Sequence, residues 1–277
     1  METNGQLTPS RTTELLREIG HTPVKKLGQN FLIDSNIVRK SLELADVRAG
    51  DEIVEVGPGL GTLTGALLGA GARVYAVELD RELFAFLKGR YVCENLSLIN
   101  ADAVEFPRAG LPAESPADFK VVANLPYAIS TPWLDKILSG KLPRAMSLML
   151  QKEAADRFCA RDGGEYSPIS ICLGQAYEIS ARHKVSASCF YPKPSVDSVL
   201  LALRRRANPF VFKPATKEIM RYAFSKRRKQ ISSIAKSAGE FADVMLRWLG
   251  ADAEIAGDVR PERIGAEHWR ALDAIVK

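Results

Sequence analysis

The sequence predicts an α/β fold built on a parallel sheet, followed by a small all-helical domain. Apolar runs end near Val56, Val77, Ile99 and Ala123, and polar residues or glycine follow each of them. Runs that are apolar on both faces are typical of buried parallel strands. Segments of helical periodicity lie between these runs, as in doubly wound sheets. By contrast, the last quarter of the chain shows helical periodicity alone.

The expected elements follow in chain order. Residues 1–24 form a polar leader with a short helical stretch at 13–19, which we expect to be loosely held. Asp34 is a good N-cap for a helix that ends at Leu44, because its carboxylate accepts the free amide hydrogens of the first turn. A fifth strand is expected at 146–150, an antiparallel pair at 177–185 and 198–203, and helices at 215–224, 226–236, 242–249 and 266–276. The predicted domains are the leader at 1–24, a sheet domain at 25–206 and a helical domain at 207–277.

The composition suits one large domain with a small one attached. The chain has 277 residues, and 46% of them are hydrophobic, which is enough for a sizeable core. No apolar run approaches the length of a membrane span, and the N-terminus lacks a secretory pattern. The four cysteines are scattered without a C-x-x-C pair, so we expect reduced thiols, no metal site and a cytoplasmic protein.

The positive charge is concentrated in the C-terminal quarter. Residues 1–203 hold 22 basic and 24 acidic side chains, whereas residues 204–277 hold 16 and 9. Such asymmetry favours a polyanionic partner that is held through its phosphates, although a solvated helix face is the alternative. At helical spacing Arg227 shares a face with Ile231, so some of these arginines are expected to pack. The two clusters are Arg204, Arg205 and Arg206, and Lys226, Arg227, Arg228 and Lys229.

A glycine-rich turn, residues 55–61 (EVGPGLG), joins the first strand to a helical run. Glycines allow a tight turn and a close approach of the backbone to a ligand. The spacing is G-x-G-x-G, and a turn of this kind is a weak signal by itself. The next strand ends in Glu78, roughly 20 residues on, where a carboxylate meets ribose hydroxyls in such sheets. Asn100 and Asp102 follow the third strand, as a polar pair placed to reach an adenine edge. Taken alone, Glu78 would be interpreted as a solvent-exposed residue at the end of a strand.

The tetrad Asn124, Leu125, Pro126 and Tyr127 follows the fourth strand. An amide oxygen, a backbone carbonyl and an aromatic ring suit a flat base that carries an amino group, because they offer two acceptors and a stacking face. An ordinary exit from strand to loop is the alternative. With the glycine turn and Glu78 at neighbouring strand ends, the binding interpretation is favoured.

With these residues in hand, the chain resembles the KsgA/Dim1 family of ribosomal RNA adenine N6-dimethyltransferases, and its bacterial KsgA branch best. The similarity runs from Lys25 almost to the C-terminus. Six segments occur in the family's order, which makes the signal highly specific. They are 26–32 (KLGQNFL), 55–61 (EVGPGLG), 124–127 (NLPY), 151–153 (QKE), 190–198 (FYPKPSVDS) and 224–229 (FSKRRK).

The resemblance implies a Rossmann-like class I methyltransferase sheet with S-adenosylmethionine as methyl donor. Glu78 is expected to accept hydrogen bonds from the donor's ribose and Asp102 from its adenine amino group. The implied substrate is a pair of adjacent adenosines in the 3′-terminal hairpin loop of 16S rRNA, each dimethylated in the small subunit or its late precursor. We expect a monomer, with Lys25 and Lys26 joining the two basic clusters on the RNA. The positions that match the family's donor contacts are Asn30, Leu32, Gly57, Glu78, Asp102 and Asn124.

The expected mechanism depends on geometry, since an adenine amino nitrogen is a poor nucleophile and a sulfonium methyl is already electrophilic. The Asn124 side-chain oxygen and the Leu125 carbonyl would accept the amino hydrogens, which favours a pyramidal nitrogen and a direct in-line displacement. Tyr127 would stack on one face of the flipped base. Phe190 is the candidate for the other face, with a core position as the alternative.

Three rivals remain. A related class methylates an adenine in large-subunit rRNA, and the basic helical domain and Leu125 favour the small-subunit enzyme over it. A DNA adenine methyltransferase is disfavoured by Leu125 in place of proline and by the lack of an obvious base-reading domain. A catalytically silent RNA-binding assembly factor on the same fold is disfavoured because the glycine turn, Glu78, Asp102 and the tetrad are all present.

Overall fold

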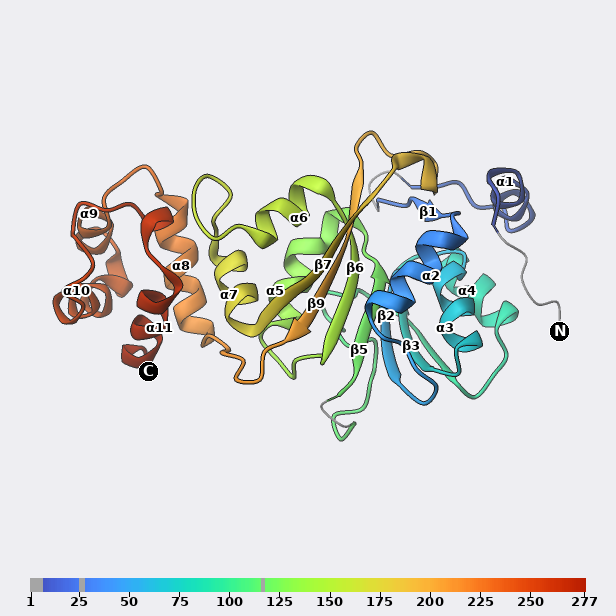
Figure 1. The fold of residues 1–277 in the computed structure, drawn as a ribbon, viewed down its shortest axis with the longest axis horizontal. Coiled ribbons are helices and arrows are strands. Elements are labelled where there is room, and N and C mark those ends of the chain that lie inside the picture. The colour runs from blue at the N-terminus through green and yellow to red at the C-terminus, as the bar shows by residue number, and fades with distance from the viewer. Residues whose placement is uncertain (1–6, 25–27, 116–117) are drawn as a thin grey trace. The chain divides into compact units, whose positions relative to one another are not determined.

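A computed structural model describes residues 7–24, 28–115 and 118–277 (Figure 1). The chain divides into two compact units. The first comprises residues 1–155 and 178–205, and the second comprises residues 156–177 and 206–277. The helical unit therefore takes in residues 156–177, which the sequence analysis placed with the sheet, and the helix at 168–176 packs against the helix at 214–225.

The first unit is built on a seven-stranded sheet in the order β4-β3-β2-β5-β6-β9-β7. Strands β4, β3, β2, β5 and β6 pair in parallel, and β9 pairs antiparallel with β6. The predicted α/β class and parallel sheet are thus confirmed. The strands are β2 (Glu52–Val56), β3 (Arg73–Glu78), β4 (Leu96–Asn100), β5 (Lys120–Asn124), β6 (Ala145–Gln151), β7 (Tyr177–Val185) and β9 (Ser198–Arg205).

Strand β2 lies between β3 and β5, so the chain order reverses beside it. In an open α/β sheet, the carboxyl ends of the strands at such a switch point leave a crevice that binds ligands. Ile53 and Val54 of β2 are fully buried, as are Val121 and Val122 of β5. The buried centre of the sheet therefore fixes where its polar strand ends emerge.

Helices and a small second sheet complete this unit. Asp34 caps α2 as expected, since its carboxylate accepts the amide hydrogens of Asn36 (2.8 Å) and Ile37 (3.2 Å). Strand β1 (Phe31–Leu32) pairs antiparallel with β8 (Phe190–Tyr191). The helices are α1 (Pro9–Glu18), α2 (Ser35–Leu44), α3 (Thr62–Gly69), α4 (Arg81–Arg90) and α5 (Ser130–Ile137), with 3-10 turns η2 (Tyr127–Ile129) and η3 (Ala187–Cys189). Helix α6 (Lys152–Cys159) begins in this unit and ends in the second.

The leader is held more firmly than the sequence indicated. Leu15 and Leu16 of α1 are buried, and they pack in one cluster with Phe31, Leu60 and Leu83. The expectation of a loosely held segment is therefore wrong for residues 7–24. The leader is polar in composition, so the sequence did not indicate that its two adjacent leucines pack against residues far along the chain.

The second unit is helical and is centred on stacked aromatic rings. The rings of Trp248 and Trp269 are 5.0 Å apart, and Phe224 lies 5.9 Å from Trp269. The helix expected at 226–236 begins only at Ile231, because α8 ends at Ser225 and residues 226–229 form a turn. The elements are α7 (Pro168–Ala176), α8 (Pro214–Ser225), α9 (Ile231–Lys236), η4 (Gly239–Phe241), α10 (Ala242–Ala251), η5 (Pro261–Arg263) and α11 (Ala266–Ile275).

Within the described residues, none of the helices has the length and apolar character needed to cross a membrane. All four cysteines are free thiols.

A buried ion pair fastens the start of β5. Lys120 is only 1% exposed, and its ammonium donates to the Asp51 carboxylate at 2.7 Å and to the Asp46 carbonyl oxygen. Removing one partner of a buried pair leaves a charge without compensation. We expect Asp51→Asn, which keeps an oxygen for the Arg48 amide, to lower the free energy of unfolding in urea by about 2 kcal/mol. Adding Lys120→Met should restore at least half of that loss, and an Asp51→Asn variant as stable as the wild type would contradict this role.

Candidate active site

A single cavity lies at the carboxyl ends of the strands in the sheet unit. Six segments line it: residues 28–32, the glycine turn with the start of α3, the ends of β3, β4 and β5, and Leu83 of α4. Most of the residues proposed for catalysis and donor binding meet here. They are Asn30, Leu32, Gly57, Glu78, Asp102, Asn124, Leu125, Pro126 and Tyr127. Residues far apart in the chain thus form one continuous site.

The glycine turn is in direct contact with the tetrad. Gly57 has φ +65°, and a Cβ atom there would lie 2.9 Å from Cγ of Pro126. Gly59 has φ +59°, and a Cβ atom would lie 3.0 Å from the ring of Phe31. Side chains are disfavoured at both positions by the backbone conformation and by space. The turn can therefore close against both walls of the cavity only because it lacks side chains there.

Glu78, the last residue of β3, is fixed at the cavity by backbone donors. Its carboxylate accepts hydrogen bonds from the amides of Gly59 (3.1 Å) and Asp80 (2.9 Å). Burial raises the pKa of Glu78, while these two amides act in the opposite direction. Each carboxylate oxygen has a second acceptor position. Glu78 can therefore also accept hydrogen bonds from hydroxyl groups of a bound ligand.

Only one member of the polar pair after β4 lines the cavity. Asp102 does so, and its carboxylate accepts the amide hydrogen of Val104 at 2.7 Å. The Asn100 amide instead donates to the backbone oxygens of Glu78 (2.8 Å) and Leu79 (3.1 Å). Asn100 therefore braces the end of β3, and the expectation that it reaches an adenine edge is wrong for this arrangement.

The Asn124 amide has a defined orientation. Its nitrogen donates to the backbone oxygen of Asn30 at 2.8 Å, and the Asn30 amide nitrogen donates in turn to the Gly28 oxygen. Because the nitrogen is engaged in this way, the side-chain oxygen is the end left to accept a hydrogen bond from a ligand. The adjacent Leu125 is held by its own amide, which donates to the Met149 oxygen at 3.2 Å.

The two aromatic candidates occupy different environments. The Tyr127 hydroxyl is 2.8 Å from the Ser198 hydroxyl, which fixes the ring beside the cavity. Burial raises the pKa of Tyr127, so the phenol is neutral at physiological pH. Phe190 is 2% exposed, packs among apolar residues that include Leu32, and is not part of the cavity wall. The structure therefore gives Phe190 the alternative core position, and its stacking role stays a prediction.

Glu55 is a cavity residue that the sequence reasoning missed as a separate site. It is 1% exposed, lines the cavity beneath the glycine turn, and accepts a hydrogen bond from the Thr64 hydroxyl at 2.8 Å. Burial, with a smaller contribution from the charge of Glu78, raises the pKa of Glu55 to about 8. An acid inside an otherwise apolar strand (IVEV) was the available signal.

The basic clusters contain both exposed and internally bonded side chains. Arg205 donates to the Leu142 oxygen at 2.8 Å, and Arg206 donates to the Gly174 oxygen at 2.9 Å. Arg227 donates to the oxygens of Gly164 (2.8 Å) and Tyr166 (2.9 Å). These three arginines therefore have structural roles within their own units. The exposed members of the clusters are Arg204, Arg228 and Lys229, and Lys226 is half-buried with its ammonium 4.2 Å from the centre of the Tyr222 ring. Lys25 and Lys26 lie outside the described residues.

The buried Glu55 predicts a specific pH dependence of stability. Below its ordinary pKa near 4.5 the carboxyl is protonated in both states, whereas between 4.5 and about 8 folding must bind a proton. Stability is therefore lost as pH rises through this window. Glu55→Gln has no proton to bind at this position. The free energy of unfolding of Glu55→Gln minus that of the wild type should therefore rise by roughly 2–4 kcal/mol between pH 5 and pH 8.

Urea denaturation at several pH values measures this difference directly. Glu105→Gln, at an exposed glutamate, is the matched control and should run parallel to the wild type. A Glu55→Gln curve that also stays parallel would show that Glu55 is not buried as the acid.

Comparison with known proteins agrees with this geometry. A family model described as ribosomal RNA adenine dimethylase matches residues 20–260. The ribosomal RNA small subunit methyltransferase A of Opitutus terrae is 54% identical over 272 residues, which cover 96% of this chain and 98% of that protein.

Solved structures share the fold. A dimethyladenosine transferase from Plasmodium falciparum has a TM-score of 0.70 at 24% identity, over 87% of this chain and 95% of its own. The 23S rRNA methyltransferase ErmE has a TM-score of 0.61 at 25% identity, over 89% and 99%. With a family model matched over most of its length and a full-length relative above half identical, this chain belongs to the ribosomal RNA adenine dimethylase family.

Proposed function

We propose that this protein transfers methyl groups from S-adenosylmethionine to N6 of two adjacent adenosines in the 3′-terminal hairpin loop of 16S rRNA, two methyl groups to each. The observation that carries the proposal is the single cavity that joins the glycine turn and Glu78 to the tetrad at 124–127. A donor and a base bound at these two ends would meet inside one site.

The residues present suit the donor. The glycine turn leaves room where a Cβ atom would clash, and Glu78 offers acceptor positions for ribose hydroxyls. Asp102 stands at the neighbouring strand end for an adenine amino group, with residues 30–32 as the opposite wall. Two buried acids, Glu55 and Glu78, also suit a cofactor that carries positive charge. When bound, S-adenosylmethionine supplies an electrophilic methyl group on a sulfonium.

The tetrad supplies the groups that an adenine needs. An adenine amino nitrogen has its lone pair delocalised into the ring, so it must be turned into a better nucleophile. The Asn124 side-chain oxygen and the Leu125 carbonyl accept its two hydrogens, which favours a pyramidal nitrogen with its lone pair free. Tyr127 offers its ring for stacking on a base that has left its own stack, and the bond to Ser198 holds that ring in place.

The small-subunit substrate is favoured over the rivals. The relative from Opitutus terrae that is named for the small subunit matches nearly end to end at 54% identity, whereas the large-subunit enzyme ErmE reaches 25%. A silent assembly factor would have no need of an intact donor side, yet Gly57, Glu78 and Asp102 all line the cavity.

We further infer that the protein works as a monomer in the cytoplasm on an assembling small subunit. The exposed Arg204, Arg228 and Lys229 are available for phosphates of the rRNA.

Asn124→Ala tests the chemistry. With undermethylated small subunits and labelled donor, we expect the wild type to label N6 of both adenosines. The variant should bind S-adenosylmethionine within about fivefold of the wild type but lose at least about 100-fold in single-turnover rate, because one acceptor for the amino group is gone. Tyr127→Phe keeps the ring and loses only the Ser198 contact, so it should keep most activity. Wild-type turnover in Asn124→Ala would exclude this role, and label in the large subunit instead would exclude the proposed substrate.

The exposed and internally bonded basic residues predict different phenotypes. The double variant Arg228→Ala, Lys229→Ala should bind the rRNA more weakly, with a salt dependence reduced by roughly one to two ions and an unchanged melting temperature. Arg227→Ala should instead lower the free energy of unfolding by about 1–2 kcal/mol, because the carbonyls of Gly164 and Tyr166 lose a charged donor. Binding titrations at several salt concentrations check this. If RNA binding by the double variant depends on salt concentration as steeply as binding by the wild type, this turn does not contact the RNA.

A further inference from the structure

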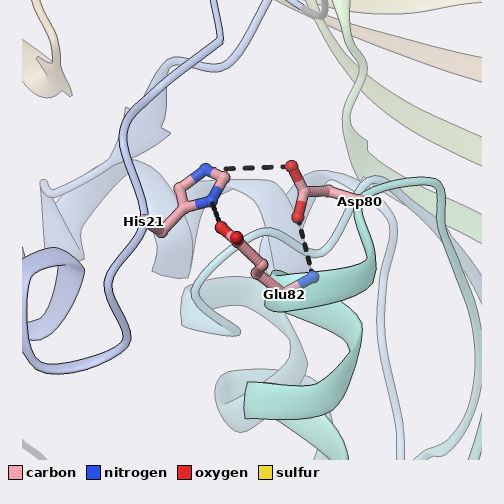
Figure 2. A group of neighbouring side chains, drawn as sticks. All are labelled: His21, Asp80 and Glu82. Atoms are coloured by element: carbon pink, nitrogen blue, oxygen red, sulfur yellow. Dashed lines mark hydrogen bonds and ion pairs between the residues drawn. The ribbon is translucent and has the colours of Figure 1, made fainter.

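The leader carries a buried histidine that the proposed catalytic site does not use. His21 follows α1, and its side chain is 2% exposed. It lies between two carboxylates at the start of α4, as Figure 2 shows. Nδ1 is 2.7 Å from Glu82 Oε2, and Nε2 is 3.8 Å from Asp80 Oδ2 and 3.0 Å from the side-chain oxygen of Gln29.

The hydrogen-bond pattern determines the proton count on the ring. The Gln29 oxygen accepts the Val24 amide hydrogen at 2.7 Å, and the Gln29 nitrogen donates to Asp80 at 3.1 Å. These two bonds fix the orientation of the Gln29 side-chain amide independently of His21. Nε2 therefore faces an acceptor and must donate. Nδ1 faces a carboxylate and must donate as well, so His21 is an imidazolium.

A metal ion fits this arrangement poorly. A metal binds the lone pair of one ring nitrogen, and its other ligands must converge on the same point. Here the two carboxylates approach opposite nitrogens of the ring. The described charged groups that face His21 are Asp80 and Glu82, and Gln29 is the neutral group from the segment before β1. Burial lowers the pKa of His21. The hydrogen bonds to Glu82 and Gln29 and the two negative charges together raise it by more, so the net shift is upward.

The same network continues into the cavity. Asp80 caps α4 through the amides of Glu82 and Leu83, and its own amide donates to Glu78. Gln29 belongs to the cavity wall. On the apolar side, Leu15 and Leu16 of α1 pack in one cluster with Phe31, Leu60 and Leu83, and these three residues also line the cavity.

We propose that His21 is a positioning residue for the methyl donor: as an imidazolium it fastens residues 7–24 to Asp80 and Glu82 and so holds the Gly28–Leu32 wall and Glu78 in place. The inference rests on the proposed function, since the donor is the ligand of this cavity. The leader acts as a strap over the outer side of the donor pocket, and it touches neither the base nor the reacting atoms.

His21→Gln tests the positioning role, because it removes the positive charge of the imidazolium. We expect the dissociation constant for S-adenosylmethionine, measured by calorimetry at pH 7, to rise about tenfold, while the turnover number at saturating donor stays within twofold. Amide hydrogen exchange of residues 9–18 should be faster in the variant. Glu82→Gln, at a half-exposed partner, should act in the same direction and more weakly. Arg11→Gln removes one positive charge from the same leader, where Arg11 pairs with Glu14 and Glu18, and should change none of these values.

Nitrogen chemical shifts of the His21 ring decide the proton count without any donor. Two protonated nitrogens at pH 7, unchanged by a chelator, support the strap, whereas one bare or metal-bound nitrogen overturns it. The advantage of the wild type over His21→Gln in donor affinity should fade as pH rises through the raised pKa of His21, above 6.5. If the wild type binds the donor and His21→Gln binds it with the same dissociation constant, only the positioning role is overturned. A wild type that binds no donor overturns the proposed function as well.

Discussion

The site depends on the contact between Gly57 and Pro126. A Cβ atom on Gly57 would lie 2.9 Å from the proline ring, so the glycine turn and the tetrad meet at a separation that any other residue would widen. This contact joins the end of β2 to the end of β5, which are neighbours in the sheet but about 70 residues apart in the chain. The glycine turn and the tetrad, which we propose bind the donor and the base, therefore line one cavity.

Buried carboxylates give the pocket an electrostatic preference. Glu55 and Glu78 are both almost without solvent, and burial raises the pKa of each. A ligand that brings positive charge would favour their ionised forms, because an opposite charge lowers a carboxyl pKa. The hydrogen bonds to Glu55 and Glu78 offset part of the cost of burying these acids, and a bound cationic ligand would offset more of it. A sulfonium cofactor with a free ammonium group is such a ligand, and a neutral nucleoside is not.

The sequence predicted the parts of the molecule that local pattern determines. The parallel strands, the Asp34 cap and the cavity residues at strand ends follow from periodicity and from where parallel strands must end. What it missed depends on partners far along the chain. Leu15 and Leu16 of the leader pack with Phe31 and Leu83, and Arg227 donates from the turn after α8 to the carbonyls of Gly164 and Tyr166. Glu55 was overlooked because its importance comes from its burial within β2, which its place next to the glycine turn did not reveal.

The basic residues show why net charge overstates the RNA contact. A guanidinium has five donors in a rigid fork, so it can serve the free carbonyls of turns as well as it serves phosphates. Arg205, Arg206 and Arg227 are used in that way here. The exposed residues of the two clusters are therefore fewer than the sequence indicates, and charge alone provides attraction without selection. In the function proposed above, selection of the adenine falls to the tetrad, where two oxygens and a ring can distinguish an amino-bearing base from one that presents a carbonyl.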